Sequence, residues 1–199
     1  DQAEERRENL IECLADLDND IAELYLEGEE IPKNKLREVI RKLVINNEFV
    51  PVLCGSAFKN KGVQPLLDAV VEFLPSPTDR GAVTGVCGKN KEKKIAREPS
   101  PKEPFSGLAF KIASDPFVGT LTYFRIYSGE LTSGQTVFNP LVGKRERITK
   151  MLVMHANKRE EVQKAYAGDI VALVGLKSTT TGQTLCLEKS KVIYDLMEF

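Results

Sequence analysis

One segment of the chain has the residue types and spacing to bind a nucleotide base: Gly55-Ser56-Ala57-Phe58-Lys59-Asn60-Lys61-Gly62. The apolar run before it, Phe49–Cys54, is expected to be a buried strand, and an apolar-periodic helix is expected to follow. Small side chains let a backbone approach a flat base, and free N–H groups of such a loop can donate to a carbonyl oxygen. On this segment alone, an ordinary turn between a strand and a helix is the simpler interpretation.

The other parts of a GTP-hydrolysing site are absent from the 199 residues. No GxxxxGK[ST] loop is present to surround phosphates with N–H groups and a lysine. The sequence has no DxxG magnesium loop, and none of its four Asn-Lys pairs has the Asp of an Asn-Lys-x-Asp motif. We therefore expect no catalytic residue, no metal site and no bound cofactor in this chain by itself.

A second group of residues could bind phosphates through charge. It is the densest basic stretch of the second half, with Lys144, Arg145 and Arg147 followed by Lys158 and Arg159. Each phosphate neutralised by such residues adds salt-dependent affinity for a nucleic acid. A solvated strand face and hairpin explain the stretch equally well. The single histidine, His155, has no nucleophile beside it in the sequence and is expected at the surface.

Composition separates the chain into two parts. Of its 28 basic and 29 acidic residues, 10 and 17 lie in residues 1–80, which leaves 18 and 12 in residues 81–199. The first part is therefore acidic and the second basic, so the second could face a polyanion. No run is apolar and long enough to span a bilayer, and the charged start is unlike a signal peptide. Four cysteines without a CxxC pair indicate free thiols in a reducing cytoplasm.

The periodicity of apolar residues changes along the chain. Leucine and isoleucine spacings of three and four predict helices over 10–24, 36–44 and 63–74. Five of the ten prolines lie in residues 75–104, where periodicity is lost. From Phe105 the period is two, with regular turn residues, which predicts an antiparallel barrel or sandwich. We expect an α/β part over 1–80, a linker or extended loop over 81–103, whose run Lys89–Lys94 is expected to be a mobile loop, and a β domain over 104–199.

Several motifs in one order resemble bacterial elongation factor G, the ribosomal translocase GTPase. They are the 55–62 loop, Leu74-Pro75-Ser76-Pro77, Asp115-Pro116-Phe117-Val118-Gly119, Met154-His155-Ala156-Asn157-Lys158-Arg159, Ala167-Gly168-Asp169-Ile170 and Met197-Glu198-Phe199. The resemblance implies the end of a P-loop GTPase G domain, with helices of its inserted subdomain, followed by the translation-factor β-barrel. It also implies that the chain is an internal segment of a longer parent protein.

The resemblance assigns roles to individual residues. Ser56 and Ala57 match the last guanine-recognition motif, in which the alanine N–H contacts the guanine O6, and Phe58 agrees with the elongation factor G form of that motif. The leading helices would face the ribosomal stalk protein, and the barrel, with its basic residues, would contact small-subunit ribosomal RNA. GTP or GDP with Mg²⁺ would be bound in the parent by other segments, and the implied location is the cytoplasm, with no membrane partner.

Two alternatives remain open. A related factor, such as release factor three or a ribosome-protection GTPase, would share much of the same architecture. A stand-alone RNA-binding barrel with a helical protein-binding arm belongs to a different class, because barrel folds serve many functions. The runs around Ala57 and His155 favour the translocase.

Overall fold

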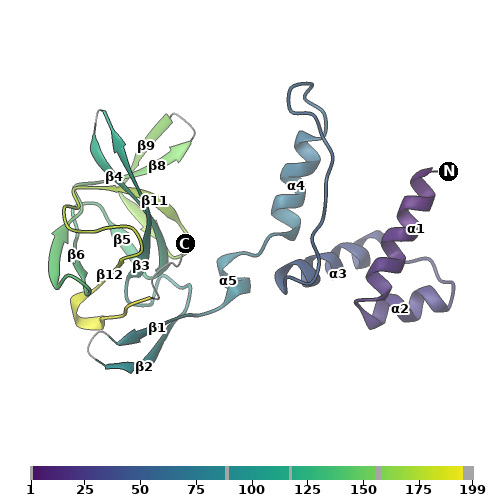
Figure 1. Cartoon of the computed structure of the whole chain (residues 1–199), viewed down its shortest axis with the longest axis horizontal. Coiled ribbons are helices and arrows are strands. Elements are labelled where there is room, and N and C mark those ends of the chain that lie inside the picture. Colours follow the sequence, from purple (N-terminus) through teal and green to yellow (C-terminus); the bar gives the residue numbers. More distant parts are fainter. Residues whose placement is uncertain (1, 88–89, 117, 156–157, 195–199) are drawn as a thin grey trace. The chain divides into compact units, whose positions relative to one another are not determined.

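The computed structural model describes residues 2–87, 90–116, 118–155 and 158–194 (Figure 1). The chain forms two compact units, residues 1–80 and 81–199, and each is described by itself. Parts of four sequence motifs, residues 88–89, 117, 156–157 and 197–199, lie outside the described residues. Within the described residues, no helix is both long and apolar enough to cross a lipid bilayer.

The first unit is built from helices. They are α1 (Gln2–Ala15), α2 (Asn19–Leu26), α3 (Lys33–Ile45), α4 (Val63–Phe73) and the short α5 (Pro77–Arg80). The helices predicted over 36–44 and 63–74 are confirmed as α3 and α4. Leu14, Ile21 and Leu43 are fully buried between α1, α2 and α3, where they form the centre of the apolar cluster.

The single helix predicted over 10–24 is instead two helices, with a break at residues 16–18. Asp18 caps α2, because its Oδ1 accepts hydrogen bonds from the N–H groups of Asp20 (3.2 Å) and Ile21 (3.4 Å). Its other oxygen accepts a 2.8 Å bond from Lys42 Nζ on α3. The hydrogen bond from Lys42 lowers the pKa of Asp18. This buried carboxylate therefore joins the start of α2 to α3.

The buried strand predicted over Phe49–Cys54 is wrong. The segment is extended but makes no ladder, and Val52 is 88% exposed. A strand is stabilised by hydrogen bonds to a neighbour, and no other strand lies among the described residues of the first unit. The helix that follows shares this exposure, because Leu67 and Val71 of α4 lie largely in solvent and only Ala69 is buried.

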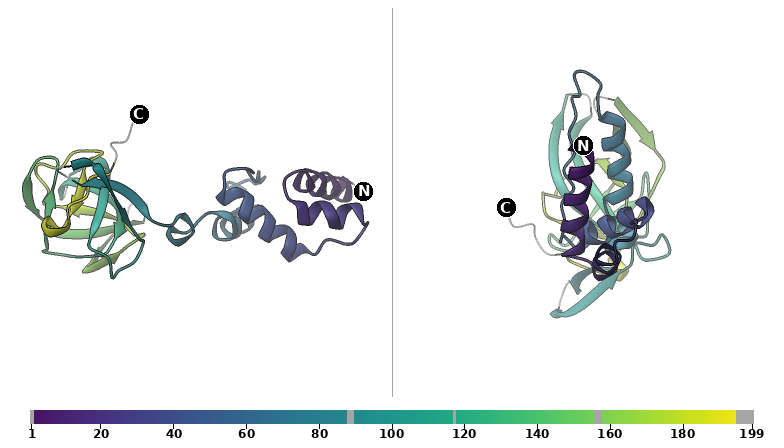
Figure 2. Two further views of the ribbon diagram at one scale, coloured as in Figure 1. Left: turned by 90° about the horizontal axis from the view of Figure 1, so that it is seen from below. Right: turned by 90° about the vertical axis from the view of Figure 1, so that its right-hand side faces the viewer.

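The second unit is a sheet of antiparallel strands, as the period-two pattern predicts. Eight strands lie in the order β7-β6-β12-β3-β4-β11-β8-β9, and β5 pairs with β10. Their bounds are β3 (Ser106–Asp115), β4 (Gly119–Ser128), β5 (Glu130–Thr132), β6 (Thr136–Asn139), β7 (Lys144–Arg147), β8 (Lys150–His155), β9 (Lys158–Val162), β10 (Lys164–Tyr166), β11 (Ile170–Val174) and β12 (Thr184–Cys186). The sheet curls around a core centred on Phe124, Ile126 and Leu173 (Figure 2).

A hairpin occupies much of the stretch expected as a linker or extended loop. Strands β1 (Val83–Cys87) and β2 (Asn90–Arg97) pair with each other, and Val86 exchanges two backbone hydrogen bonds with Ile193, of 2.8 and 2.9 Å. Val83 and Ile95 pack against the cluster that contains Phe138 and Tyr194. The prolines lie outside the hairpin, so they do not prevent its ladder. The run Lys89–Lys94, expected to be mobile, begins outside the described residues and continues into β2.

Candidate functional site

The 55–62 loop is a tight turn closed by its own backbone. Ser56 and Lys61 exchange hydrogen bonds of 2.8 and 3.0 Å, and the N–H of Asn60 donates to the carbonyl of Ala57 at 3.0 Å. Asn60 has the left-handed φ of 51°, which asparagine tolerates better than most residues. The loop therefore has a fixed shape without help from other elements.

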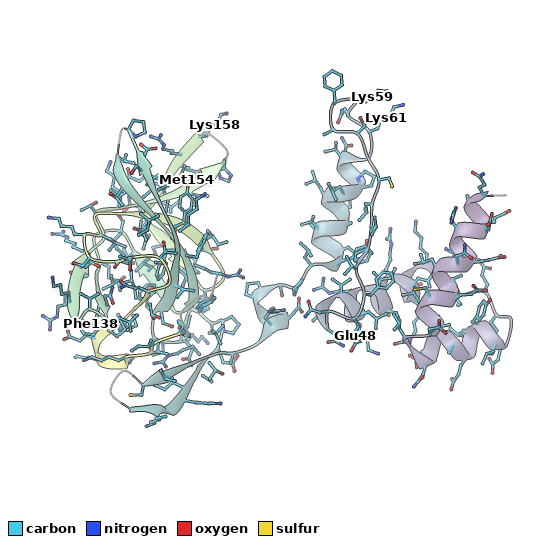
Figure 3. All side chains as sticks on the ribbon, in the orientation of Figure 1. Glu48, Lys59, Lys61, Phe138, Met154 and Lys158 are labelled. Carbon is cyan, nitrogen blue, oxygen red and sulfur yellow. The ribbon has the colours of Figure 1, made fainter. Side chains whose placement is uncertain are left out.

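Gly62 is required where the loop joins α4. Its φ is +75°, and a Cβ there would lie 2.8 Å from the carbonyl oxygen of Cys54. The incoming segment and the helix start therefore touch through backbone atoms alone. Lys59 and Lys61 extend from the loop at this end of α4 (Figure 3).

Two N–H groups of the loop remain available for a ligand. Within the described residues, the backbone hydrogen bonds of the turn leave the N–H groups of Ala57 and Phe58 without an acceptor. Ala57 is exposed, and the Phe58 side chain is 100% exposed. Adjacent free N–H groups on a rigid turn can donate to a carbonyl oxygen of a planar base, which is the chemistry expected from the sequence.

The structure divides the predicted basic stretch between two strands at opposite ends of the sheet order. Lys144, Arg145 and Arg147 lie on β7, and Lys158 and Arg159 lie on β9. In Figure 3, Lys158 lies at the end of the β8–β9 hairpin, far from Phe138 of β6, the neighbour of β7. The five residues therefore form two separate surfaces rather than one.

On β7, Glu146 is buried, whereas Lys144, Arg145 and Arg147 are exposed. Glu146 is 8% exposed, and its Oε1 accepts 2.6 Å hydrogen bonds from the N–H groups of Lys177 and Ser178. Burial alone would raise the pKa of Glu146, but these bonds, with one from the Thr179 hydroxyl, hold it below its ordinary value. Since this carboxylate is buried and stabilised by neutral donors, the exposed side chains of β7 are the basic ones.

Both arginines of β7 have a partner among the described residues. Arg145 pairs with Glu188 at 2.6 Å, while its side chain stays largely exposed. The Arg147 Nε–H donates to the carbonyl of Gly134 at 3.2 Å. A pocket of about 380 Å³ lies beside them and is also lined by Lys177. Because a guanidinium has five N–H donors, each arginine can still bind another acceptor.

On β9, acidic neighbours cancel the basic charge. Arg159 forms a 2.5 Å ion pair with Asp115, a carboxylate that is 10% exposed. Glu161 pairs with Lys150 of β8, and Glu160 lies 3.9 Å from His155. His155 is exposed, as expected from the sequence. The hairpin thus presents Lys158 next to two glutamates, and its surface is close to neutral.

Sequence reasoning missed several cations that the fold brings near β7. Lys177 lies in the loop that contacts Glu146, and Arg97, Lys189 and Lys191 line a pocket formed by the hairpin and the η1 turn (Glu188–Ser190). None of them belongs to a dense basic run. The salt bridge from Arg145 to Glu188 is the contact that joins η1 to β7.

No metal-binding cluster is present in the part of the chain that the structure describes. Its histidine, cysteine and carboxylate side chains include no group of three or more arranged to hold an ion. The four cysteines are free, with Cys13 and Cys54 exposed, Cys87 half-buried and Cys186 buried. Burial raises the pKa of the Cys186 thiol, which makes it a poor nucleophile.

Comparison with known proteins identifies both units. Residues 1–76 match the family profile of the elongation factor Tu GTP binding domain, and residues 119–186 match that of elongation factor Tu domain 2. In fold class, the chain is therefore part of a GTP-binding domain of the elongation factor Tu type, followed by a domain 2. The partial GTP-binding domain carries the 55–62 loop, and domain 2 carries both basic strands.

A solved structure is similar to this chain over most of its length. It is a crystal structure of a protein from Thermus thermophilus, with 28% sequence identity and a TM-score of 0.67. The match covers 93% of this chain and 25% of the other. The chain therefore spans about a quarter of the length of the protein it resembles in structure.

Proposed function

We propose that this chain is part of a ribosomal translocase of the elongation factor G type, a GTPase that moves tRNA and mRNA during protein synthesis. The observation that carries the proposal is the 55–62 loop, in which two adjacent N–H groups are free on a rigid turn of Gly-Ser-Ala-Phe sequence. The match to a translation elongation factor GTP-binding domain supports a nucleotide as the ligand of this loop.

The loop would read the guanine edge in the parent protein. The N–H of Ala57 donates to the guanine O6, Phe58 supplies a second N–H beside it, and Ser56 fixes the turn through Lys61. Adenine carries an amino group where guanine has O6, so two N–H donors would face another donor. The turn therefore favours guanine over adenine, because adenine offers no acceptor to the two N–H groups of the loop. GTP or GDP and its Mg²⁺ would be held by phosphate-binding segments outside these 199 residues.

Domain 2 would dock on small-subunit ribosomal RNA through Lys144, Arg145 and Arg147 of β7 and through Lys158 and Arg159 of β9. Cationic side chains at the two ends of the sheet suit contacts to phosphates at two separate points. The acidic helices α1 and α2 would face the ribosomal stalk protein, and the remaining domains of the parent would complete the factor in the cytoplasm.

The guanine-reading part of the proposal is tested by calorimetry on the 199-residue chain. Without a P-loop, we expect no GTP hydrolysis and very weak GDP binding, because one or two hydrogen bonds do not offset the entropy of association. A micromolar dissociation constant for GDP would contradict the proposal that most of the nucleotide site lies outside this chain. In the parent protein, Ala57→Pro removes the key N–H and should weaken GDP binding about tenfold or more, whereas Ala57→Ser, which keeps it, should not.

A further inference from the structure

A pocket of about 340 Å³ lies in the second unit, and one of its lining residues, Glu188, is bonded to Arg145 of β7. It is lined by Cys87 at the end of β1, Arg97 at the end of β2, and Ser190, Lys189 and Lys191 in and after η1. No sequence pattern groups these residues, since Arg97 and Ser190 are 93 positions apart in the chain.

Arg97 is poorly satisfied for a buried charge. Its side chain is 13% exposed, and its two hydrogen bonds are long: 3.4 Å from Nη1 to Glu103 and 3.3 Å from Nη2 to the carbonyl of Ser190. Its Nε–H has no acceptor among the described residues. A guanidinium offers five N–H donors, and buried donors are normally hydrogen-bonded, so an acceptor in this pocket that Arg97 can reach would be favoured.

Most of the charged groups that line the pocket with Arg97 are positive, although Arg97 itself pairs with Glu103 at 3.4 Å. Lys189 lies at the exposed rim, and Lys191 Nζ lies 4.7 Å above the Phe138 ring, which holds it beside the pocket. Among the residues lining the pocket, Glu188 carries the negative charge, and its carboxylate is engaged by Arg145 at 2.6 Å. The pocket therefore combines two lysines and Arg97, which Glu103 partly compensates through a long ion pair, with one acid that Arg145 already engages.

We propose that this pocket binds a phosphate group. A tetrahedral oxyanion offers acceptors on several sides, so it can meet the planar guanidinium of Arg97 and the two ammonium groups together. The proposal goes beyond the RNA docking of β7 and β9 and does not depend on it. Inorganic phosphate and the phosphodiester backbone of RNA share this chemistry, and the experiment separates them.

Cys87 provides a reporter inside the pocket. It is half-buried, whereas Cys186 is buried, so in a Cys13→Ser/Cys54→Ser chain an added alkylating reagent reacts at Cys87. Inorganic phosphate at millimolar concentration should slow this reaction several-fold and saturate. Sodium chloride at matched ionic strength should leave the rate unchanged. No protection by phosphate, or equal slowing by both salts, would overturn the proposal.

Variants at the rim test the charges directly. Lys189→Gln combined with Lys191→Gln should raise the phosphate concentration for half-protection about tenfold, since each lost contact is charge-assisted. Lys164→Gln on β10, whose side chain is 51% exposed and pairs with Glu130, removes one charge elsewhere in the same unit and should change nothing. If Lys189→Gln/Lys191→Gln leaves protection by phosphate as unchanged as Lys164→Gln does, the proposed site is contradicted. Arg97→Lys keeps the charge but loses the planar fork and should also weaken protection.

The same Cys87 protection experiment with a short single-stranded RNA shows whether the ligand is free phosphate or the RNA backbone. Protection by RNA at concentrations below those needed for inorganic phosphate identifies the phosphodiester backbone as the ligand. Protection by inorganic phosphate alone identifies the free ion. Protection by neither overturns the proposal while leaving the guanine-reading function of the 55–62 loop untouched.

Discussion

The strands β7 and β9 begin with the same three residues and yet present different surfaces. β7 reads Lys144-Arg145-Glu146-Arg147, and β9 reads Lys158-Arg159-Glu160-Glu161. On β7 the glutamate is buried against the loop 177–179, so the exposed face is basic. On β9 Glu160 is exposed beside His155, and Arg159 is neutralised by Asp115.

The difference arises from what covers each strand. Glu146 pairs in register with the buried Val137, so its side chain points toward the interior, where the 177–179 loop surrounds it. Strand β11 pairs with Lys150, Met151 and Leu152 of β8, so the end of the β8–β9 hairpin projects past it. Identical residue types therefore give a basic edge where the fold covers the acid, and a nearly neutral edge where it does not.

The largest expected effect separates the two glutamates. Glu146→Gln should destabilise the second unit by about 3 kcal/mol, because three hydrogen bonds to a buried charge are weakened or lost. Glu160→Gln should stay within about 0.5 kcal/mol, as is usual for an exposed site. Urea unfolding of both variants measures the contrast. Equal effects would show that the two glutamates are not distinguished by burial.

Acid should remove the stabilisation that the ionised Glu146 carboxylate gives to the second unit. The folded pKa of Glu146 lies below its ordinary value of 4.5, so its stabilisation is present above about pH 4.5 and is lost as the pH falls through the folded pKa. Wild type should therefore lose more stability than Glu146→Gln as the pH falls below about 4.5. Thermal unfolding on both sides of this pH tests it. Parallel curves for the two proteins would contradict a lowered pKa.

For the arginines, the larger loss of stability is expected on β9 and not on β7. Arg159→Gln leaves the nearly buried Asp115 carboxylate without its 2.5 Å partner and should cost about 1–2 kcal/mol. Arg145→Gln breaks an exposed pair with Glu188 and should cost about 0.5 kcal/mol or less. The two variants remove the same charge, so a comparison by urea unfolding isolates burial as the cause. A larger loss for Arg145→Gln would reverse the contrast.

The smallest effect concerns RNA. Lys144→Gln with Arg147→Gln should weaken binding of the 199-residue chain to small-subunit ribosomal RNA about fivefold at low salt, and should reduce the salt slope by roughly 1–2. Lys158→Gln should reduce the slope by less than one, because Glu160 and Glu161 already offset its charge. Filter binding at two salt concentrations measures both. Binding that ignores salt would exclude the electrostatic account of either edge.

Much of the secondary structure follows from local patterns. The spacing of Leu36, Val39, Ile40 and Leu43 predicts α3 because these side chains share one helical face, and all four are buried. The alternation after Phe105 predicts the antiparallel strands for the equivalent reason. Local patterns failed where a polar residue has a long-range partner, as at Asp18, whose cap and bond to Lys42 break the first helix.

The 49–54 segment shows a second limit. Its Val-Pro-Val-Leu run is apolar enough for a buried strand, but a strand needs a neighbour as well as an apolar sequence. Conversely, the stretch 81–103 lacks a clear period and still contains a hairpin, because Val86 bonds to Ile193 far along the chain. In both cases the structure depended on whether a segment distant in the sequence was there to pair with: the 81–103 stretch has such a partner, and the 49–54 segment has none among the described residues.

The sequence by itself determined the order of a helical acidic part and a basic β part, and it singled out the 55–62 loop, because these depend on residues close together in the chain. The tertiary structure alone decided which charges reach the surface. It buried Glu146, paired Arg159 with Asp115, and gathered Arg97, Lys189 and Lys191 around one pocket. The physical reason is that burial and pairing depend on which side of a strand faces the core and on which loop covers it.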